Sequence, residues 1–296
     1  MFNFEQLRMF VEAAEQGSFS AAAKKLGKVQ SAISQGIANL EIDFGLKLFD
    51  RSSRKPTLTV DGERLYKYAK VIVLQTNELS IATQSVYAGE ESVIRLAIDD
   101  ACLTDSFSDL MNRFCEQFPA TELELISTLS TSVPELVSKG GADIGIMVSN
   151  LAFHQDLTAS FIGSLPIVAV SHPQHPLSRL TQVNEMDLIV HRQFMLRDCD
   201  GRVFDQFPVQ PAKKIWVNNV NTIRSLLIKS SQGWAFMPKH LVIDDIALGR
   251  LAKIYLEFDH IEWSPPIDMV IKKGKLEGKA LEWLSKDLRH YITSNS

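Results

Sequence analysis

A run of short polar side chains between residues 30 and 39 has the chemistry to bind the edges of DNA bases. Amide and hydroxyl groups both donate and accept hydrogen bonds, and base edges in a major groove present both kinds of partner. Apolar residues recur among them at helical spacing, so the polar groups are expected to share one exposed face of a helix. The polar residues are Gln30, Ser31, Ser34, Gln35 and Asn39, and the apolar ones are Ala32, Ile33, Ile37 and Leu40.

A second helix is predicted directly before this one and would brace it. Ser18 is a typical N-cap residue, Phe19 to Leu26 carries apolar residues at helical spacing, and Gly27 can end the helix. Two helices around a tight break, from about residue 19 to 38, form the unit that places a helix in a major groove. An ordinary helical hairpin with a polar outer face fits the same residues, so both interpretations stay open here.

A short basic hairpin is predicted after these helices. Phe49 and Leu58 are expected to be buried, and the loop between them carries Arg51, Arg54 and Lys55. Such a hairpin is typical of the wing of a winged helix, where Arg51 and Arg54 would contact phosphates or enter a minor groove. The same charges also fit a solvated surface loop.

The charge of the chain is unevenly distributed. Seven basic and three acidic residues lie between positions 24 and 55, a local charge of +4, so the rest carries −8 to reach the total of −4. One end of an acidic molecule is therefore expected to contact nucleic acid. The 296 residues, 45% hydrophobic and 22% charged, are ordinary for a globular chain of two or three domains.

Many residues between positions 7 and 62 keep fixed spacings that match a known pattern. The pattern comprises Leu7-x-x-Phe10, Gly17-Ser18-Phe19-Ser20, Ala22-Ala23-x-x-Leu26, Gln30-Ser31-Ala32-Ile33-Ser34, Ile37-x-x-Leu40-Glu41, Leu48-Phe49-x-Arg51 and Leu58-Thr59-x-x-Gly62. On these residues the segment resembles the amino-terminal domain of LysR-type transcriptional regulators. One departure is Val29, where that family commonly has a Ser or Thr cap, and the loss should cost about 1 kcal/mol.

One long helix is predicted next, because no Pro or Gly follows Gly62 until Gly89. Its apolar residues alternate by three and four, which is typical of a coiled coil and implies a partner copy. The resemblance implies the same, since this is the linker helix through which the family dimerises. Packing of the helix on its own carboxyl-terminal domain is the alternative. The seam positions are Leu65, Tyr68, Ile72, Gln75, Leu79, Ala82 and Val86.

Strands alternate with helices over the remainder of the chain, which predicts an α/β fold with parallel, doubly wound sheets. Two such lobes joined by crossing strands resemble periplasmic binding proteins and the LysR-type effector domain, whose usual landmarks match Gly140-x-Ala142-Asp143-Ile144-Gly145 and Gly233 to Pro238. The predicted division is a winged helix-turn-helix domain over 1–60, a linker and dimerisation helix over 61–90, and an effector-binding domain over 91–296. Lobe I would comprise 91–163 and 266–296, and lobe II 164–265.

Three loops at the carboxyl ends of predicted strands form the candidate effector site, namely 99–104, 127–131 and 197–201. The hydroxyl-rich loop Ser127 to Thr131 suits a carboxylate, although it could also simply cap the helix that follows. By analogy with the family, Ser130 and Thr131 would face Arg197 across the lobes.

Two acids, Asp99 and Asp100, depart from a simple anion site and would suit an amine or hydroxyl group, so the effector class stays open. The predicted effector residues are Asp100, Ala101, Cys102, Ser130, Thr131 and Arg197.

The three cysteines lie at positions without metal or disulfide spacing. Cys102 and Cys199 fall in candidate cleft loops and could form a redox pair or be ordinary buried thiols, whereas Cys115 is expected to pack in an apolar run. No histidine has a partner at metal spacing, and no Ser/His/Asp order indicates a hydrolase. The sequence thus predicts no catalytic residue, no metal and no cofactor, and a protein that is not an enzyme.

The favoured function is a sequence-specific DNA-binding transcriptional regulator, modulated by a small-molecule effector bound between the lobes. The resemblance implies double-stranded DNA with a partly palindromic operator, a homodimer or homotetramer, and RNA polymerase as partners. The alternative is a cytoplasmic small-molecule-binding protein or enzyme that uses its amino-terminal helices only for assembly. A cytoplasmic location without membrane contact is expected, because no apolar stretch reaches roughly 20 residues and the start is unlike a signal peptide.

Overall fold

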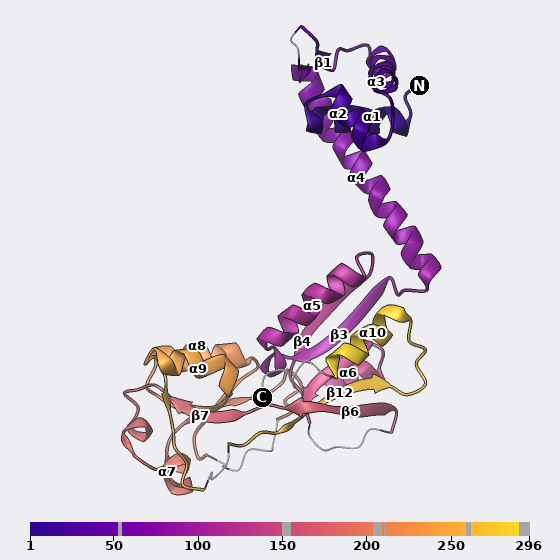
Figure 1. Cartoon of the computed structure of the whole chain (residues 1–296). Coiled ribbons are helices and arrows are strands. Elements are labelled where there is room, and N and C mark those ends of the chain that lie inside the picture. The colour runs from indigo at the N-terminus through magenta and orange to yellow at the C-terminus, as the bar shows by residue number, and fades with distance from the viewer. Residues whose placement is uncertain (53–54, 150–154, 204–208, 210, 259–261, 290–296) are drawn as a thin grey trace. The chain divides into compact units, whose positions relative to one another are not determined.

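The computed structural model describes residues 1–52, 55–149, 155–203, 209, 211–258 and 262–289 (Figure 1). The predicted wing residue Arg54 therefore lies outside the described residues. The chain forms two compact units, Met1–Gln84 and Ser85–Ser296.

The N-terminal unit packs three helices around one apolar core. Phe10 of the first helix and Ile33 and Ile37 of the third are fully buried there. The Ser18 side chain accepts a hydrogen bond from the backbone N–H of Ala21, which confirms the predicted cap. The elements are α1 (Phe4–Gln16), α2 (Phe19–Leu26), α3 (Gln30–Phe44), β1 (Phe49–Asp50), β2 (Thr57–Leu58) and α4 (Val60–Ala88).

Strands β1 and β2 pair antiparallel as the predicted hairpin, with Phe49 opposite Leu58. The rings of Phe10 and Phe19 pack edge-on against Phe49, with centroids 5.7 and 5.2 Å away. Gly62, in the first turn of α4, lies so close to the Leu48 carbonyl that a Cβ atom would overlap it. This contact explains why the Gly62 position cannot carry a side chain.

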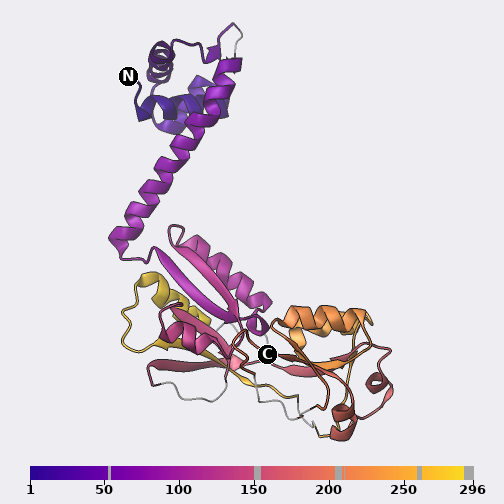
Figure 2. The same cartoon turned by 180° about the vertical axis from the view of Figure 1, so that it is seen from behind.

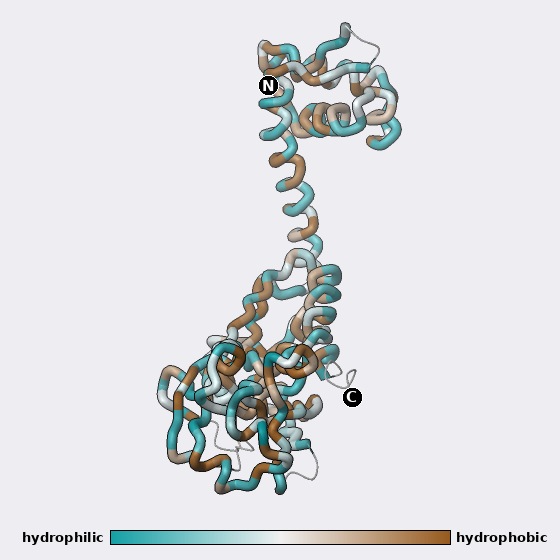
Figure 3. Tube along the Cα trace, turned by 90° about the vertical axis from the view of Figure 1, so that its left-hand side faces the viewer, coloured by the Kyte–Doolittle hydropathy of each residue, from teal (hydrophilic) through white to brown (hydrophobic). Residues whose placement is uncertain are grey.

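Helix α4 contributes its first turns to the N-terminal core and then exposes apolar residues. Leu65 packs on that core, and Ala69 is buried in it. Further along, brown and teal segments alternate on the helix in Figure 3, and Ile72 and Leu79 are 44% and 67% exposed. Most of the predicted seam is therefore exposed within a single chain.

One sheet of the C-terminal unit has the strand order β4-β3-β5-β12-β6 and is covered on both faces. Leu96 and Ile98 pack towards α5 and α10, while Ala97 between them packs towards α6. This alternation follows from the two-residue period of a strand. The elements are β3 (Val93–Asp99), η1 (Asp100–Cys102), α5 (Asp105–Gln117), β4 (Glu122–Thr128), α6 (Val133–Ser138), β5 (Ile144–Val148), β6 (Leu157–Ser164), β12 (Pro266–Lys272) and α10 (Lys279–Leu288).

The other sheet has the order β11-β7-β10-β8-β9. Val168 and Val170 pack against α8 and α9, whereas Ala169 packs against the layer that contains α7. Figures 1 and 2 show α8 and α9 on one side of this sheet and α7 on the other. The elements are β7 (Ile167–Ser171), η2 (Pro176–Arg179), α7 (Glu185–Val190), β8 (Gln193–Leu196), β9 (Lys214–Val217), α8 (Val220–Lys229), β10 (Trp234–Pro238), α9 (Lys239–Ala247) and β11 (Ala252–Lys253).

Both sheets are mixed, so the prediction of parallel sheets holds only in part. Strand β3 is parallel to β4 and β5, but β12 is antiparallel to β5 and β6. The antiparallel strand arises because the chain crosses between the lobes twice and β12 returns to the first sheet. Where the two crossings meet, Ile167 N–H donates to the Trp263 carbonyl at 2.8 Å and Leu165 N–H to the Pro265 carbonyl at 3.0 Å.

Candidate DNA-binding surface and interlobe site

Helix α3 exposes most of the predicted base-contacting residues. Gln30, Ser31 and Gln35 are exposed and Ser34 is half-buried. The Gln35 side-chain amide donates to the side-chain Oδ1 of Asn39 at 2.8 Å. The opposite face of the helix is held in the core, so the polar groups occupy a fixed surface with amides and hydroxyls directed to solvent.

Close packing with α1 fixes the position of α3. A side chain at Gly36 would collide with the sulfur of Met9, so these two helices approach as closely as a glycine allows. Val29 precedes the helix in extended conformation and provides no side-chain hydrogen bond, as predicted from its type. Backbone N–H groups of Ala32 and Ile33 bond to the Val29 carbonyl, which does not replace the missing cap.

A buried carboxylate, Glu41, joins α3 to the hairpin. Glu41 is 4% exposed and accepts hydrogen bonds from the Leu48 N–H at 2.8 Å and the Phe49 N–H at 3.2 Å. Its other oxygen accepts from the Arg51 guanidinium at 3.0 Å. A carboxylate with this many donors fixes the start of the hairpin relative to the helix. Its spacing motif was visible in the sequence, but its role was not.

Arg51 has a structural partner as well as solvent exposure. Its guanidinium pairs with Glu41 and lies 5.4 Å from the centroid of the Phe19 ring. The side chain remains 41% exposed, so one side of the guanidinium stays accessible. Arg51 thus orders the hairpin in addition to any contact with phosphate.

The basic patch is weaker than the count over residues 24 to 55 indicated. Lys25 pairs with Glu12 at 2.7 Å and Lys28 pairs with Glu5 at 3.1 Å. Both acids belong to α1, outside the counted segment, and the fold brings them beside the bases. The candidate surface on α3 therefore offers amides and hydroxyls rather than a large excess of positive charge.

A cavity of about 50 Å³ lies between the two lobes of the C-terminal unit. Its wall is mainly apolar, with Val148 from the first lobe and Leu196, Val220 and Phe236 from the second. Of the six predicted effector residues, Ala101, Ser130 and Thr131 line it within the described part of the chain.

Asp99 is a buried acid that also lines this cavity. Its carboxylate accepts hydrogen bonds from the Ser130 N–H at 2.7 Å, the Ser130 hydroxyl at 2.5 Å and the Ala101 N–H at 2.9 Å. Burial raises the pKa of Asp99 above its ordinary value, although those hydrogen bonds oppose the change and nearby Asp100 adds to it. Ser130 also accepts from the Val148 N–H at 2.8 Å, so its hydroxyl is used within the protein.

The neighbours of Ala101, Asp100 and Cys102, do not line the cavity. Asp100 accepts hydrogen bonds from the Ser127 hydroxyl and, across the lobes, from the Asn219 amide at 2.5 Å. Cys102 is fully buried in the core, and burial followed by the Asp99 charge raises its thiol pKa well above the ordinary value. A thiol held protonated is a poor redox centre.

Arg197 does not occupy its predicted place opposite Ser130 and Thr131. Its guanidinium lies over the Trp216 ring, 4.4 Å from the centroid, on the exposed side of the second lobe. Leu196 lines the cavity, and the next residue along an extended strand points the other way. The residue that contacts the Thr131 hydroxyl across the lobes is Asp198.

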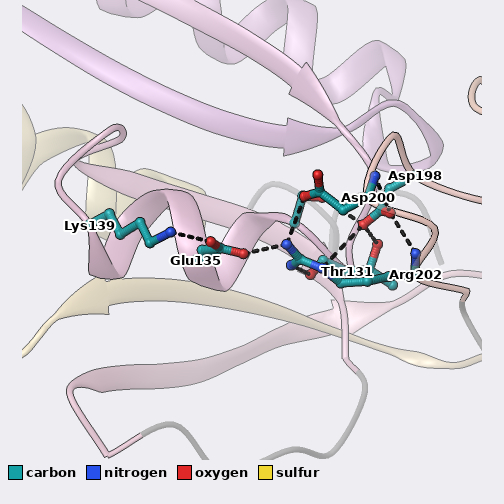
Figure 4. Close-up of polar contacts among 7 residues, drawn as sticks. Thr131, Glu135, Lys139, Asp198, Asp200 and Arg202 are labelled. Atoms are coloured by element: carbon teal, nitrogen blue, oxygen red, sulfur yellow. Dashed lines mark hydrogen bonds and ion pairs between the residues drawn. The ribbon is translucent and has the colours of Figure 1, made fainter.

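Two hydroxyls of the first lobe bind the Asp198 carboxylate of the second (Figure 4). Thr131 donates at 3.0 Å and Ser132 at 2.9 Å to the same oxygen. Arg202 adds a hydrogen bond of 3.1 Å to the Thr131 carbonyl and an ion pair with Glu135 of α6. The predicted hydroxyl-rich loop does bind a carboxylate, but the carboxylate belongs to the chain itself.

The remaining cysteines are both accessible. Cys199, next to Asp198, is exposed, and so is Cys115 on α5, whose predicted packing in the apolar core is wrong. Among the described residues no three His, Cys, Asp or Glu side chains are arranged to hold a metal ion. No helix in that part of the chain is long and apolar enough to cross a membrane.

Two family models together match nearly the whole chain. Residues 4–63 match the bacterial regulatory helix-turn-helix protein model of the lysR family, and residues 88–292 match the LysR substrate-binding domain. A similar curated protein is the HTH-type transcriptional regulator AceR of Acinetobacter baumannii, 26% identical over 97% of each chain.

Solved structures share the fold over the full length. Full-length BenM has a TM-score of 0.53 at 22% identity, covering 97% of this chain and 96% of that one. Full-length CbnR in complex with its target DNA has a TM-score of 0.50 at 19% identity, covering 97% and 99%.

Proposed function

Because this chain belongs to the LysR family of bacterial transcriptional regulators, which bind DNA and have an effector-binding domain, we propose which of its residues contact DNA and which contact the effector. Gln30, Ser31, Ser34 and Gln35 contact base edges, and the hairpin with Arg51 and Arg54 contacts the sugar–phosphate backbone. The division into residues 1–60, 61–90 and 91–296 is part of the same proposal.

The observation that carries the DNA assignment is the two-sided construction of α3. Ile33, Ile37 and Leu40 are fully buried, while Gln30 and Gln35 on the other face are exposed. A helix fixed by its apolar side and exposing short amides and hydroxyls suits insertion into a major groove. The half-buried Ser34 suits a contact at the edge of that surface.

The proposed assembly is a homodimer through α4, which can pair into a homotetramer. Tyr68, Ile72, Leu79 and Val86 are exposed apolar residues of that helix at coiled-coil spacing. A two-fold dimer presents two copies of α3 to a partly palindromic operator. We further assign the protein to the cytoplasm, with RNA polymerase as a functional partner at its promoters.

The effector occupies the interlobe cavity beside Ala101, Ser130 and Thr131. At about 50 Å³ the cavity is smaller than the roughly 150 Å³ that accepts a benzene ring. We infer that a ring-sized effector enters as the lobes separate, and that this movement couples effector binding to the state of the DNA-binding units. The curated relatives of this chain are named as regulators rather than enzymes, so we assign no catalytic role to it.

Fluorescence anisotropy on a selected operator tests the DNA assignment. The full chain first selects a preferred duplex from a random pool, and affinities for that duplex and a scrambled one are then compared. Gln35→Ala should weaken selected-site binding about 10- to 100-fold, the loss expected for one base contact, and leave scrambled binding unchanged.

The matched control is Gln155→Ala, the same substitution in the exposed surface of the C-terminal unit. Equal losses on both duplexes, or none on either, would reject α3 as the base-contacting surface. Arg51→Ala should instead weaken both duplexes alike and reduce the salt dependence of binding.

A further inference from the structure

Asp198 has the environment of a bound ligand rather than of a surface acid. It is 9% exposed, and both of its oxygens accept hydrogen bonds. One oxygen accepts from the Thr131 and Ser132 hydroxyls of the first lobe at 3.0 and 2.9 Å. The other accepts from the backbone N–H groups of Asp200 and Arg202 in its own turn, at 3.0 and 2.7 Å.

The hydroxyl pair lies at the wall of the interlobe cavity, because Thr131 lines that cavity. Two hydroxyl groups from adjacent residues that donate to one carboxylate oxygen form a small carboxylate-binding site. In this chain the hydroxyls are on one lobe and the carboxylate is on the other. The contact therefore closes the lobes without any added molecule.

The positive charge near the site is also used within the protein. Arg202 pairs with Glu135 and Asp200 and bonds to the Thr131 carbonyl (Figure 4), and its Nε also lies 3.7 Å from a carboxylate oxygen of Asp198. A carboxylate that entered the cavity would meet the charge of Asp198 beside these hydroxyls. Like charges at such short range disfavour each other.

Asp198 keeps its charge at neutral pH. Burial alone would raise its pKa, but the hydrogen bonds from the Arg202 backbone and from the Ser132 and Thr131 hydroxyls, together with the positive charge of Arg202, outweigh burial. The resulting pKa of Asp198 lies below the ordinary 3.8. The contact between the lobes is thus made by an ionised carboxylate.

We propose that the Thr131 and Ser132 hydroxyls form a carboxylate-binding site that the chain fills with its own Asp198, and that the effector is consequently an uncharged, mainly apolar molecule in the adjoining cavity. The second part rests on the proposed function, which places the effector there. An effector of this class needs no counter-charge and enters by releasing the Asp198 contact.

Chemical rescue by acetate tests the filled site directly, in the full chain. Asp198→Ala removes the resident carboxylate, and acetate at 100 mM should raise the melting temperature of this variant by roughly 3 °C over equal sodium chloride, as binding of a weak ligand predicts. Wild-type protein should show no such rise, and uncharged acetamide should not replace acetate. Tryptophan fluorescence follows the melt, because Trp216, Trp234, Trp263 and Trp283 all lie in the C-terminal unit.

The matched control adds Thr131→Val and Ser132→Ala to Asp198→Ala and should abolish the acetate effect. No rescue of the single variant, or equal stabilisation of the wild type, overturns the self-filled site. If Asp198→Ala does not fold, Thr131→Val with Ser132→Ala in the wild-type background replaces it. Hydrogen exchange over residues 197–203 should then rise at least tenfold, and unchanged exchange overturns the proposal.

Paired probes test the effector class. Calorimetry should show that wild-type protein binds benzyl alcohol at least tenfold more tightly than benzoate. In Asp198→Ala the ratio of the two affinities should be smaller. Benzyl alcohol that binds no better than benzoate, including a failure of both, overturns the uncharged class.

A cavity-filling variant separates this result from the proposed function. Val148→Phe should abolish binding of benzyl alcohol, whereas Val190→Phe on the exposed surface of α7 should not. Undiminished binding in Val148→Phe places the ligand elsewhere and rejects the cavity itself. If Val148→Phe binds neither benzyl alcohol nor benzoate and the wild type binds both equally, the cavity remains the binding site and only the uncharged class is rejected.

Discussion

The polar groups of α3 and those of the interlobe site are of similar types but in opposite states. On α3, Gln30, Ser31 and Gln35 are exposed to solvent. At the lobes, Ser130 and Asp198 are buried and hydrogen-bonded to other parts of the chain. The first surface offers hydrogen bonds to an external partner, whereas the second has already made them.

This difference indicates how each unit achieves specificity. Under the proposed function, exposed amides exchange bonds with water for bonds with base edges at little cost, and matching of donors and acceptors distinguishes one DNA sequence from another. Buried polar groups must be satisfied within the protein, so the proposed effector would gain its affinity there from apolar contact and shape. Each of the following experiments changes one side of this comparison.

The largest expected effect comes from the buried polar centre of the N-terminal unit. Glu41→Ala leaves the Leu48 and Phe49 N–H groups and the Arg51 charge without their acceptor. Leaving two buried N–H groups without an acceptor in this way should lower the unfolding free energy of that unit by about 3 kcal/mol. Hydrogen exchange over residues 1–52 measures the loss, since no tryptophan lies there.

Glu5→Ala provides the control, because Glu5 pairs with Arg8 and Lys28 at the exposed surface. Surface pairs contribute roughly 0–1 kcal/mol, so exchange should change little. Equal effects of the two substitutions would mean that Glu41 does not organise the hairpin. Buried polar groups would then stabilise only the C-terminal unit, and not both units.

Two acids of the interlobe site should give opposite pH dependence. The raised pKa of Asp99 means that the folded protein binds the carboxyl proton of Asp99 more tightly than the unfolded chain does. The ionised form of Asp99 therefore lowers the stability of the fold, and stability is regained as pH falls towards the ordinary 3.8. The lowered pKa of Asp198 means that its stabilisation is present above 3.8 and is lost as pH falls below it.

Thermal melts of Asp99→Asn and Asp198→Asn, followed by tryptophan fluorescence, separate these contributions. The stability of wild type relative to Asp99→Asn should increase as pH falls towards 3.8. Relative to Asp198→Asn it should stay level above 3.8 and decrease at lower pH. Curves of the same sign would show that the two carboxylates share one environment.

The two units also differ in how far their sites could be predicted from sequence. The caps, spacing and apolar period of residues 18 to 41 are local properties, so the helices and the exposed face of α3 followed from the residue types. The Asp198 contact joins residues 67 and 66 positions apart, and no local pattern marks such a pair.

Local patterns also misled where the fold supplied neighbours from elsewhere. Arg197 was placed in the cleft by analogy, but strand alternation turns it towards Trp216. Strand β6 was not predicted, because its alternation of exposed and buried residues is irregular and its pairing partner, β12, lies far along the chain. The basic patch was overestimated because the acids of α1 come from outside the counted segment.

The smallest effect is expected at the start of α3, the helix with the exposed polar face, because its first turn has no side-chain cap. Val29 is 67% exposed and already has the extended conformation of an N-cap residue, with φ −83° and ψ 149°. Val29→Ser should therefore add a side-chain acceptor for the first N–H groups without a change of backbone, raising stability by about 1 kcal/mol. Hydrogen exchange at residues 30–34 should slow accordingly, whereas Val29→Ala, which removes the same apolar surface but adds no acceptor, should not slow it. Slower exchange in both variants would attribute the gain to loss of the exposed valine rather than to capping.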